Sequence, residues 1–132
     1  MSQKAKNKQV GIINQNIIDV LELTEVNDNT PIFISQGNLK HIQNKHTEAY
    51  NKYKDFISAI IDSPDYVGKN DKNKSIEYVK EITIDNNEFV KVAVRISNKG
   101  VYFVRSLYVL NDNRVKNFIE KNTLHPLTNK EK

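Results

Sequence analysis

The spacing of apolar residues changes from helical to strand-like about half-way along this chain of 132 residues. A helix is expected over residues 48–62, where apolar and aromatic side chains recur every three or four positions. Its inward face would carry Tyr50, Tyr53, Ile57, Ile60 and Ile61. A shorter helix is expected before it, with Ser35 capping its N-terminus and Leu39 and Ile42 forming its apolar stripe.

Alternation of apolar and polar residues marks the second half of the chain. Residues 75–83, 89–96 and 101–110 are predicted to be strands, and the short polar turns between them require antiparallel neighbours. A short buried strand is expected at residues 31–34, and Asp112 is placed to cap a last helix. Helices followed by a meander of strands predict an α+β domain, in which N-terminal helices pack on a C-terminal antiparallel sheet with a final short helix.

The length of the chain fits one domain with short flanking segments. Residues 1–8 are expected to be a disordered basic arm, residues 9–30 an N-terminal extension, residues 31–127 the main domain and residues 128–132 a tail. Within the extension, the apolar pattern of residues 17–23 is consistent with either a strand or a short helix.

Composition narrows the class of protein. The chain has no cysteine, so disulfides and thiolate metal sites are excluded. No apolar run approaches the roughly 20 residues of a membrane span, and residues 10–13 are too short for a signal-peptide core. We therefore expect a soluble, cytoplasmic protein without a membrane partner. The net charge of +4 and the pI of about 9.2 are compatible with a polyanionic partner, although lysine and asparagine are abundant throughout the chain.

Residues 37–46 place two of the three histidines, with two lysines, in one short predicted helix. Histidine exchanges protons near neutrality, and lysine supplies the positive charge that a phosphate needs nearby. A spacing of four residues puts His41 and Lys45 on one helix face, whereas His46 follows Ile42 by one turn and belongs near the buried side or the helix end. The alternatives are that His41 is an exposed polar residue and His46 a packing histidine. His125 is taken as structural or incidental.

Polar residues also interrupt the predicted strands. Lys80 shares a strand face with apolar residues, so it either lies at the sheet edge or lines an anion-binding cleft. Ser106 is expected on one face with Tyr102, Val104 and Tyr108, where its hydroxyl could donate to a phosphate; the alternative is a half-exposed strand face. The chain has only three arginines, and guanidinium is the better bidentate phosphate ligand. Arg95 is expected to point away from the valine stripe, and Arg105 to point opposite Ser106.

Metal chemistry is not expected from these residues, and no cofactor is predicted. Histidines five positions apart lie about 140° around a helix, which suits zinc chelation poorly. The sequence also lacks a glycine-rich phosphate loop, a nucleophile elbow and a carboxylate cluster. The phosphodiester chemistry that remains is metal-free RNA cleavage, in which the 2′-hydroxyl attacks. The protein then supplies a base, an acid and donors for the charge on phosphate.

Over residues 32–127 the chain resembles the phage-associated nuclease domains of the barnase, EndoU, colicin and RelE superfold. The resemblance rests on segments in a matching order: Ile32-Phe33-Ile34-Ser35, Gly37-Asn38-Leu39-Lys40-His41-Ile42, Lys45-His46, Ser63-Pro64-Asp65-Tyr66-Val67-Gly68, Ser75-Ile76-Glu77-Tyr78-Val79-Lys80, Val104-Arg105-Ser106-Leu107-Tyr108 and Asn122-Thr123-Leu124. It implies helices packed on an antiparallel sheet, an active cleft on a sheet face, and a ribonuclease toxin associated with phages or mobile elements. It also matches His41, His46, Lys80 and Ser106 to positions that carry helical histidines, a strand lysine and a last-strand serine.

The sequence therefore leads to two hypotheses. The first is a metal-independent endoribonuclease toxin that leaves a 2′,3′-cyclic phosphate, with RNA as substrate and an immunity or antitoxin protein as a possible partner. Its catalytic residues would be His41, His46, Lys80 and Ser106, and its RNA contacts Lys40, Lys45, Arg95 and Tyr108. The alternative is a non-catalytic phage or mobile-element module that binds a host protein or nucleic acid.

Overall fold

The structure, a computed structural model, describes residues 7–121 and 124–127. Its elements follow in chain order: β1 (Lys8–Ile13), α1 (Gln15–Leu21), β2 (Thr30–Ile34), α2 (Gln36–Lys45), α3 (Thr47–Tyr53), a 3₁₀ helix (Lys54–Phe56), α4 (Ile57–Asp62), β3 (Tyr66–Lys69), β4 (Ile76–Thr83), β5 (Asn87–Ile96), β6 (Tyr102–Leu110), α5 (Asp112–Glu120) and β7 (His125–Pro126). The seven strands of the described part form one sheet in the order β1-β2-β6-β5-β4-β3-β7. The α+β class is confirmed.

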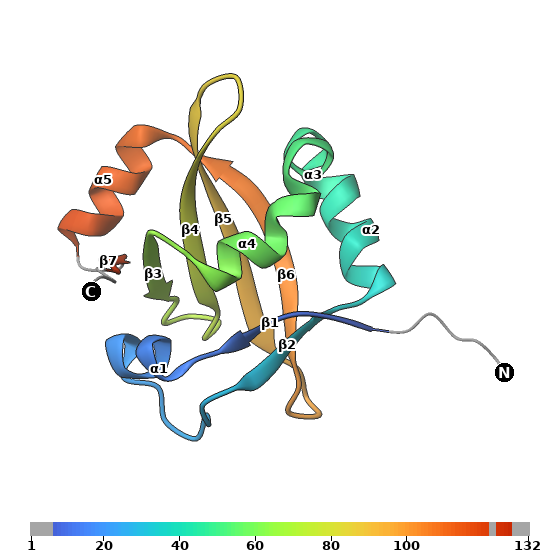
Figure 1. Ribbon diagram of the computed structural model, residues 1–132, viewed down its shortest axis with the longest axis vertical. Coiled ribbons are helices and arrows are strands. Elements are labelled where there is room, and N and C mark those ends of the chain that lie inside the picture. Colours follow the sequence, from blue (N-terminus) through green and yellow to red (C-terminus); the bar gives the residue numbers. More distant parts are fainter. Residues whose placement is uncertain (1–6, 122–123, 128–132) are drawn as a thin grey trace, which may run out of the picture.

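The predicted strands and the histidine-bearing helix lie where the sequence placed them. β4, β5 and β6 form the antiparallel meander at the centre of the sheet (Figure 1). Ser35 caps α2: its Oγ accepts a hydrogen bond from Asn38 N at 2.9 Å, and Asn38 Oδ1 accepts one from Ser35 N at 2.9 Å. This reciprocal capping box satisfies backbone donors that the first turn of a helix leaves unpaired. At α5 the capping side chain is Asn111, not the expected Asp112.

The single helix expected over residues 48–62 is wrong. The 3₁₀ turn at Lys54–Phe56 divides it into α3, which packs beside β6, and α4, which contacts β1, β4 and β5 (Figure 1). A sheet twists from strand to strand, so one straight helix would not follow both regions. The break lets Tyr53 in α3 and Ile60 in α4 both become fully buried.

The segment treated as an extension is built into the sheet. β1 pairs antiparallel with β2, and Ile13 of β1 is fully buried. Of residues 17–23, which could have formed a strand or a short helix, residues 17–21 belong to helix α1. β2 in turn pairs with β6 in parallel at Tyr102 and Phe103, so the sheet is mixed, not purely antiparallel. Sequence reasoning also missed strand β3, which begins two residues after Pro64. The tail and most of the basic arm lie outside the described residues.

The two faces of the sheet are covered differently. The main core lies under α1, α2, α3 and α4 and includes Tyr78 of β4, Val92 of β5 and Leu107 of β6. On the other face, α5 and Leu124 cover only a smaller cluster around Val79 and Leu110. The rest of that second face stays open, which leaves polar side chains of β4, β5 and β6 accessible beside α5.

Candidate active site

An open cleft of about 660 Å³ lies on the second face of the sheet, between α2, α5 and the loop that joins β3 to β4. Its lining includes seven cationic side chains against two carboxylates. The cations are Lys69, Lys72, Lys91, Arg95, Arg105, Arg114 and Lys121, and the carboxylates are Asp71 and Glu77. Charges of one sign along a cleft with protein walls raise the local concentration of an oppositely charged ligand, so the cleft is suited to an anion.

The loop wall of the cleft is held by its own asparagines. Asn70 Oδ1 accepts hydrogen bonds from the backbone nitrogens of Lys72 at 2.9 Å and Asn73 at 3.2 Å. Asn73 Oδ1 accepts one from Ser75 N at 2.9 Å. Side chains of this type stabilise turns by bonding to the backbone two or three residues later. The loop that carries Lys72 is therefore ordered before any ligand arrives.

A buried ion pair forms part of the floor. Lys91 of β5 is 5% exposed, and its Nζ lies 3.1 Å from Glu77 Oε2 of β4. The same ammonium lies 5.0 Å from the ring centroid of Tyr108 and 5.8 Å from that of Phe118. Removing two charges from water costs free energy that their attraction often fails to recover, so a buried pair is weak evidence for a stabilising role. Its place in a basic cleft instead favours a role in the chemistry of the site.

A β-bulge in β6 determines which side chains reach the cleft. Ser106 pairs with Ala93 but Val104 pairs with Val94, so Arg105 is an extra residue in the ladder. The bulge puts Val104 into the core, whereas Ser106 and Arg105 both line the cleft. The expectation that Ser106 shares a face with Tyr102 and Val104 is therefore wrong, as is the expectation that Arg105 points opposite Ser106. A bulge re-aims side chains because it shifts the two-residue alternation by one.

All three arginines of the chain line this one cleft. Arg95 points away from the valines of β5, as the alternation predicted, and Arg105 is placed by the bulge. Arg114 comes from α5, where its Cζ lies 5.6 Å from the ring centroid of Phe118. Each guanidinium offers a planar fork of donors that matches two phosphate oxygens. Three such groups from different elements make a site that fits a phosphodiester.

The two helical histidines occupy different positions. His41 is exposed and lines the cleft, so it can reach a bound phosphate. His46 lies at the end of α2, as predicted, half-buried in an adjoining cavity. Its ring stacks on Tyr108 with centroids 5.1 Å apart. Burial, followed by the charges of His41 and Lys45, lowers the pKa of His46.

Lys80 lies on the opposite face from Ser106. It alternates with Val79 along β4, on the side of the helix-covered core, and its Nζ donates a hydrogen bond to the backbone oxygen of Ser63 at 2.7 Å. The expectation that Lys80 and Ser106 face one cleft is therefore wrong. Lys80 is accommodated on an otherwise apolar strand face because its ammonium reaches the backbone carbonyl of Ser63, the C-cap residue of α4.

Only two of the four predicted RNA contacts lie in the cleft. Arg95 and Tyr108 line the cleft, Lys45 lines the adjoining cavity, and Lys40 is exposed on α2 outside both. Sequence reasoning missed Lys91 and Glu77. The available signal was the face of β5 opposite the valines, where Lys91 and Arg95 flank the small residue Ala93.

Replacing His46 with alanine should lower the free energy of unfolding by about 1 kcal/mol, because an aromatic stack contributes roughly 0.5–1.5 kcal/mol beyond burial. The pKa of His46 is lowered from 6.5 in the folded protein, so folding favours its neutral form. The parent should therefore lose part of its stability as the pH falls from about 6.5 through the lowered pKa, and His46→Ala should lose less. Denaturant unfolding of both proteins at several pH values measures this; equal stability throughout would contradict it.

The described residues form neither a metal-binding cluster nor a membrane-spanning helix. No three histidine, cysteine or carboxylate side chains there gather closely enough to hold a metal ion. Within the same ranges, no helix combines the length and apolar character needed to cross a membrane.

A mixed sheet with helices on one face and an open basic cleft on the other is compatible with a barnase-like nuclease fold. The chain belongs to the family described as phage-Barnase-EndoU-ColicinE5/D-RelE like nuclease3, whose model matches residues 7–117. That match includes β1 and α1 as well as the cleft strands. No curated protein and no solved structure matches the chain significantly.

Proposed function

We propose that this protein is a metal-independent endoribonuclease that cleaves RNA through attack of the 2′-hydroxyl on the adjacent phosphorus. The observation that carries the proposal is the convergence of all three arginines and the buried Lys91 on one cleft that also holds His41. Membership of the nuclease family supports phosphodiester chemistry, and the cationic lining supports a nucleic-acid substrate.

In this mechanism the scissile phosphate lies against the arginines, with Lys91 and Ser106 beside it. As the 2′-oxygen bonds to phosphorus, negative charge grows on the non-bridging oxygens, and donors already fixed in the cleft stabilise it. Lys91 is fixed by Glu77 and by the rings of Tyr108 and Phe118. The arginines reach the same region from two strands and a helix.

Two proton transfers complete the reaction. A base removes the proton of the 2′-hydroxyl, and an acid protonates the 5′-oxygen as its bond to phosphorus breaks; the products are a 2′,3′-cyclic phosphate and a 5′-hydroxyl. His41 and Glu77 are the groups of the cleft that we assign to these two transfers. His46, proposed from the sequence for the same role, lies in the adjoining cavity and acts on the site through its stack with Tyr108.

The toxin role, the cytoplasmic location and the immunity or antitoxin partner remain predictions from the sequence. The basic cleft adds one expectation about such a partner. An inhibitor that covers the cleft would need an acidic surface, because it must replace the phosphates that the arginines bind.

We expect cleavage of RNA to persist in EDTA. The assay maps cut sites on a long transcript and then uses two oligonucleotides that span one cut, one with ribose and one with a 2′-O-methyl group at that position. The ribose substrate should yield a 2′,3′-cyclic phosphate, detected by mass spectrometry, and the methylated substrate should remain intact. Cleavage of the methylated substrate, or activity that chelation abolishes and magnesium restores, would refute the mechanism. Tight RNA binding without any cleavage would favour the non-catalytic module.

A further inference from the structure

A second cavity of about 590 Å³ adjoins the cleft around the edge of β6. Tyr108 lines both spaces, so they are neighbours. The second cavity is formed by the end of α2, by α3, by the start of β5 and by the end of β6. Its lining differs from that of the cleft, because lysines and glutamates are balanced there and stand beside aromatic rings and apolar side chains. The charged residues are Lys45, Glu48, Lys52 and Glu88, the rings are those of His46, Tyr53 and Tyr108, and the apolar side chains are those of Ala49 and Val109.

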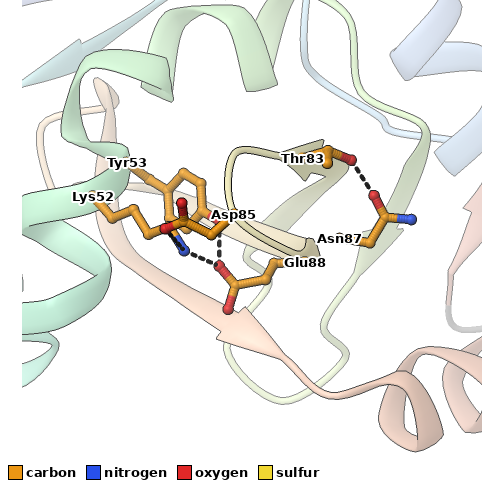
Figure 2. Close-up of polar contacts among 6 residues, drawn as sticks. All are labelled: Lys52, Tyr53, Thr83, Asp85, Asn87 and Glu88. Atoms are coloured by element: carbon orange, nitrogen blue, oxygen red, sulfur yellow. Dashed lines mark hydrogen bonds and ion pairs between the residues drawn. The ribbon is translucent and has the colours of Figure 1, made fainter.

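The chemically distinctive group in this cavity is the carboxylate of Glu88. Its Oε1 accepts hydrogen bonds from the hydroxyl of Tyr53 and from Lys52 Nζ, the latter at 3.0 Å (Figure 2). Within the described part of the chain, Oε2 has no hydrogen-bond partner, and Figure 2 shows it turned away from both donors. The bond from Tyr53, followed by that from Lys52, lowers the pKa of Glu88. The free oxygen is thus a fixed, charged acceptor.

A phosphate is the wrong ligand for such a group, since a carboxylate repels it. An acceptor of this kind requires an N–H donor, and the rings of His46 and Tyr108 offer a contact surface for a flat, weakly polar body. Val109 is 37% exposed, which is unusual for a large apolar residue in this protein and leaves an apolar contact surface open. An unstacked nucleobase has both properties, because single-stranded RNA offers base faces for packing and base edges for hydrogen bonding.

We propose that this cavity is a nucleobase-binding subsite, in which Glu88 Oε2 accepts a hydrogen bond from a ring or amino N–H of a base whose phosphate lies in the cleft. The proposal rests on the proposed function, since it takes the ligand of the cleft to be RNA. Lys52 Nζ, held beside the carboxylate, supplies a donor for a neighbouring carbonyl or ring nitrogen of the same base. Bases would then bind according to how their edges match this acceptor and donor.

Nucleoside monophosphates test the subsite without any cleavable bond. We would titrate ¹⁵N-labelled protein with the four nucleoside 3′-monophosphates and, separately, with ribose 5-phosphate. The nucleotides should shift the backbone amide signals of Ala49 and Val109 together with those of Lys91 and Ser106. Ribose 5-phosphate should shift only the signals of the cleft. Equal shifts of Ala49 and Val109 by the base-free sugar phosphate would overturn the proposal.

Two variants make the assignment specific. Glu88→Gln should weaken binding of the preferred nucleotide roughly tenfold, the cost of one hydrogen bond to a charged group, without affecting ribose 5-phosphate. Its matched control is Glu120→Gln, which removes the same charge from an exposed position on α5 outside both cavities. Val109→Lys should weaken nucleotide binding by crowding the cavity, whereas a phosphate site would bind more tightly. Tighter binding to Val109→Lys, or equal effects of the two glutamine variants, would refute a base subsite.

The outcomes separate this inference from the ribonuclease assignment. If nucleotides fill the cavity through Glu88 but RNA is never cleaved, the subsite stands and the ribonuclease fails. If RNA is cleaved but the base makes no difference to binding, the ribonuclease stands and the subsite fails.

Discussion

Replacing His41 with alanine is expected to reduce the rate of RNA cleavage by about 10²–10⁴-fold, the usual contribution of a positioned acid or base. The side chain is exposed on α2 and lines the cleft, so it can approach a bound phosphodiester without rearrangement of the core. For the same reason the free energy of unfolding should stay within about 0.5 kcal/mol of the parent. Single-turnover cleavage and thermal unfolding of the same preparations measure the two quantities.

The control for His41→Ala is Lys40→Ala on the neighbouring position of α2. Lys40 is exposed and lines neither cavity, so its loss should change only the salt-dependent part of RNA binding. The cleavage rate of Glu77→Gln is measured alongside, because Glu77 is the other group to which we assign a proton transfer. If His41→Ala cleaves at the parental rate while Glu77→Gln is inactive, the histidine is not part of the chemistry and another group must carry out the second proton transfer.

The fold was largely predictable because its strands are long and regular in pattern. β4, β5 and β6 each alternate apolar and polar residues, and their short turns leave only antiparallel pairing. The helix that carries His41 was marked by its Ser35 cap. The division between α3 and α4 was not predictable from the sequence, because Tyr53 and Ile57 keep helical spacing across the 3₁₀ turn. The break is needed only because the two helices must follow different parts of the twisted sheet. Strand β3 was missed because its four residues are too few to show a period.

The site was less predictable, since it depends on register. Strict alternation predicts that Ser106 and Val104 lie on the same strand face. The extra residue in β6 places them on opposite faces and brings Arg105 into the cleft. Lys80 and Lys91 are both charged residues within strands. The sequence does not reveal that Lys80 bonds to a backbone carbonyl whereas Lys91 pairs with a carboxylate. Lys91 meets Glu77 only because β4 pairs with β5 in a register that makes them diagonal neighbours.

Replacing Lys91 with methionine is expected to reduce turnover by about 10²–10³-fold, the typical effect of removing one donor that stabilises developing charge. RNA affinity should fall far less, because the three arginines remain in the cleft. Methionine retains most of the length of the side chain and its contacts with Tyr108 and Phe118. The variant leaves Glu77 partly buried without its partner, so some loss of stability is expected. The double variant Lys91→Met/Glu77→Gln should regain that stability, which would attribute the loss in Lys91→Met to the carboxylate left without its partner.

Lys80→Met is the matched control, because it makes the same substitution on the neighbouring strand β4 but on the opposite face of the sheet. Its bond to the Ser63 carbonyl is made on the other face of the sheet from the cleft, so turnover should stay near that of the parent. Measuring kcat and KM for both lysine variants decides between the two faces. If Lys80→Met is the inactive protein and Lys91→Met cleaves normally, the basic cleft is not the active site and the chemistry must lie on the helix-covered side. If only Lys91→Met is inactive, the buried ammonium acts on the transition state, because a residue that merely held RNA would change KM instead of kcat.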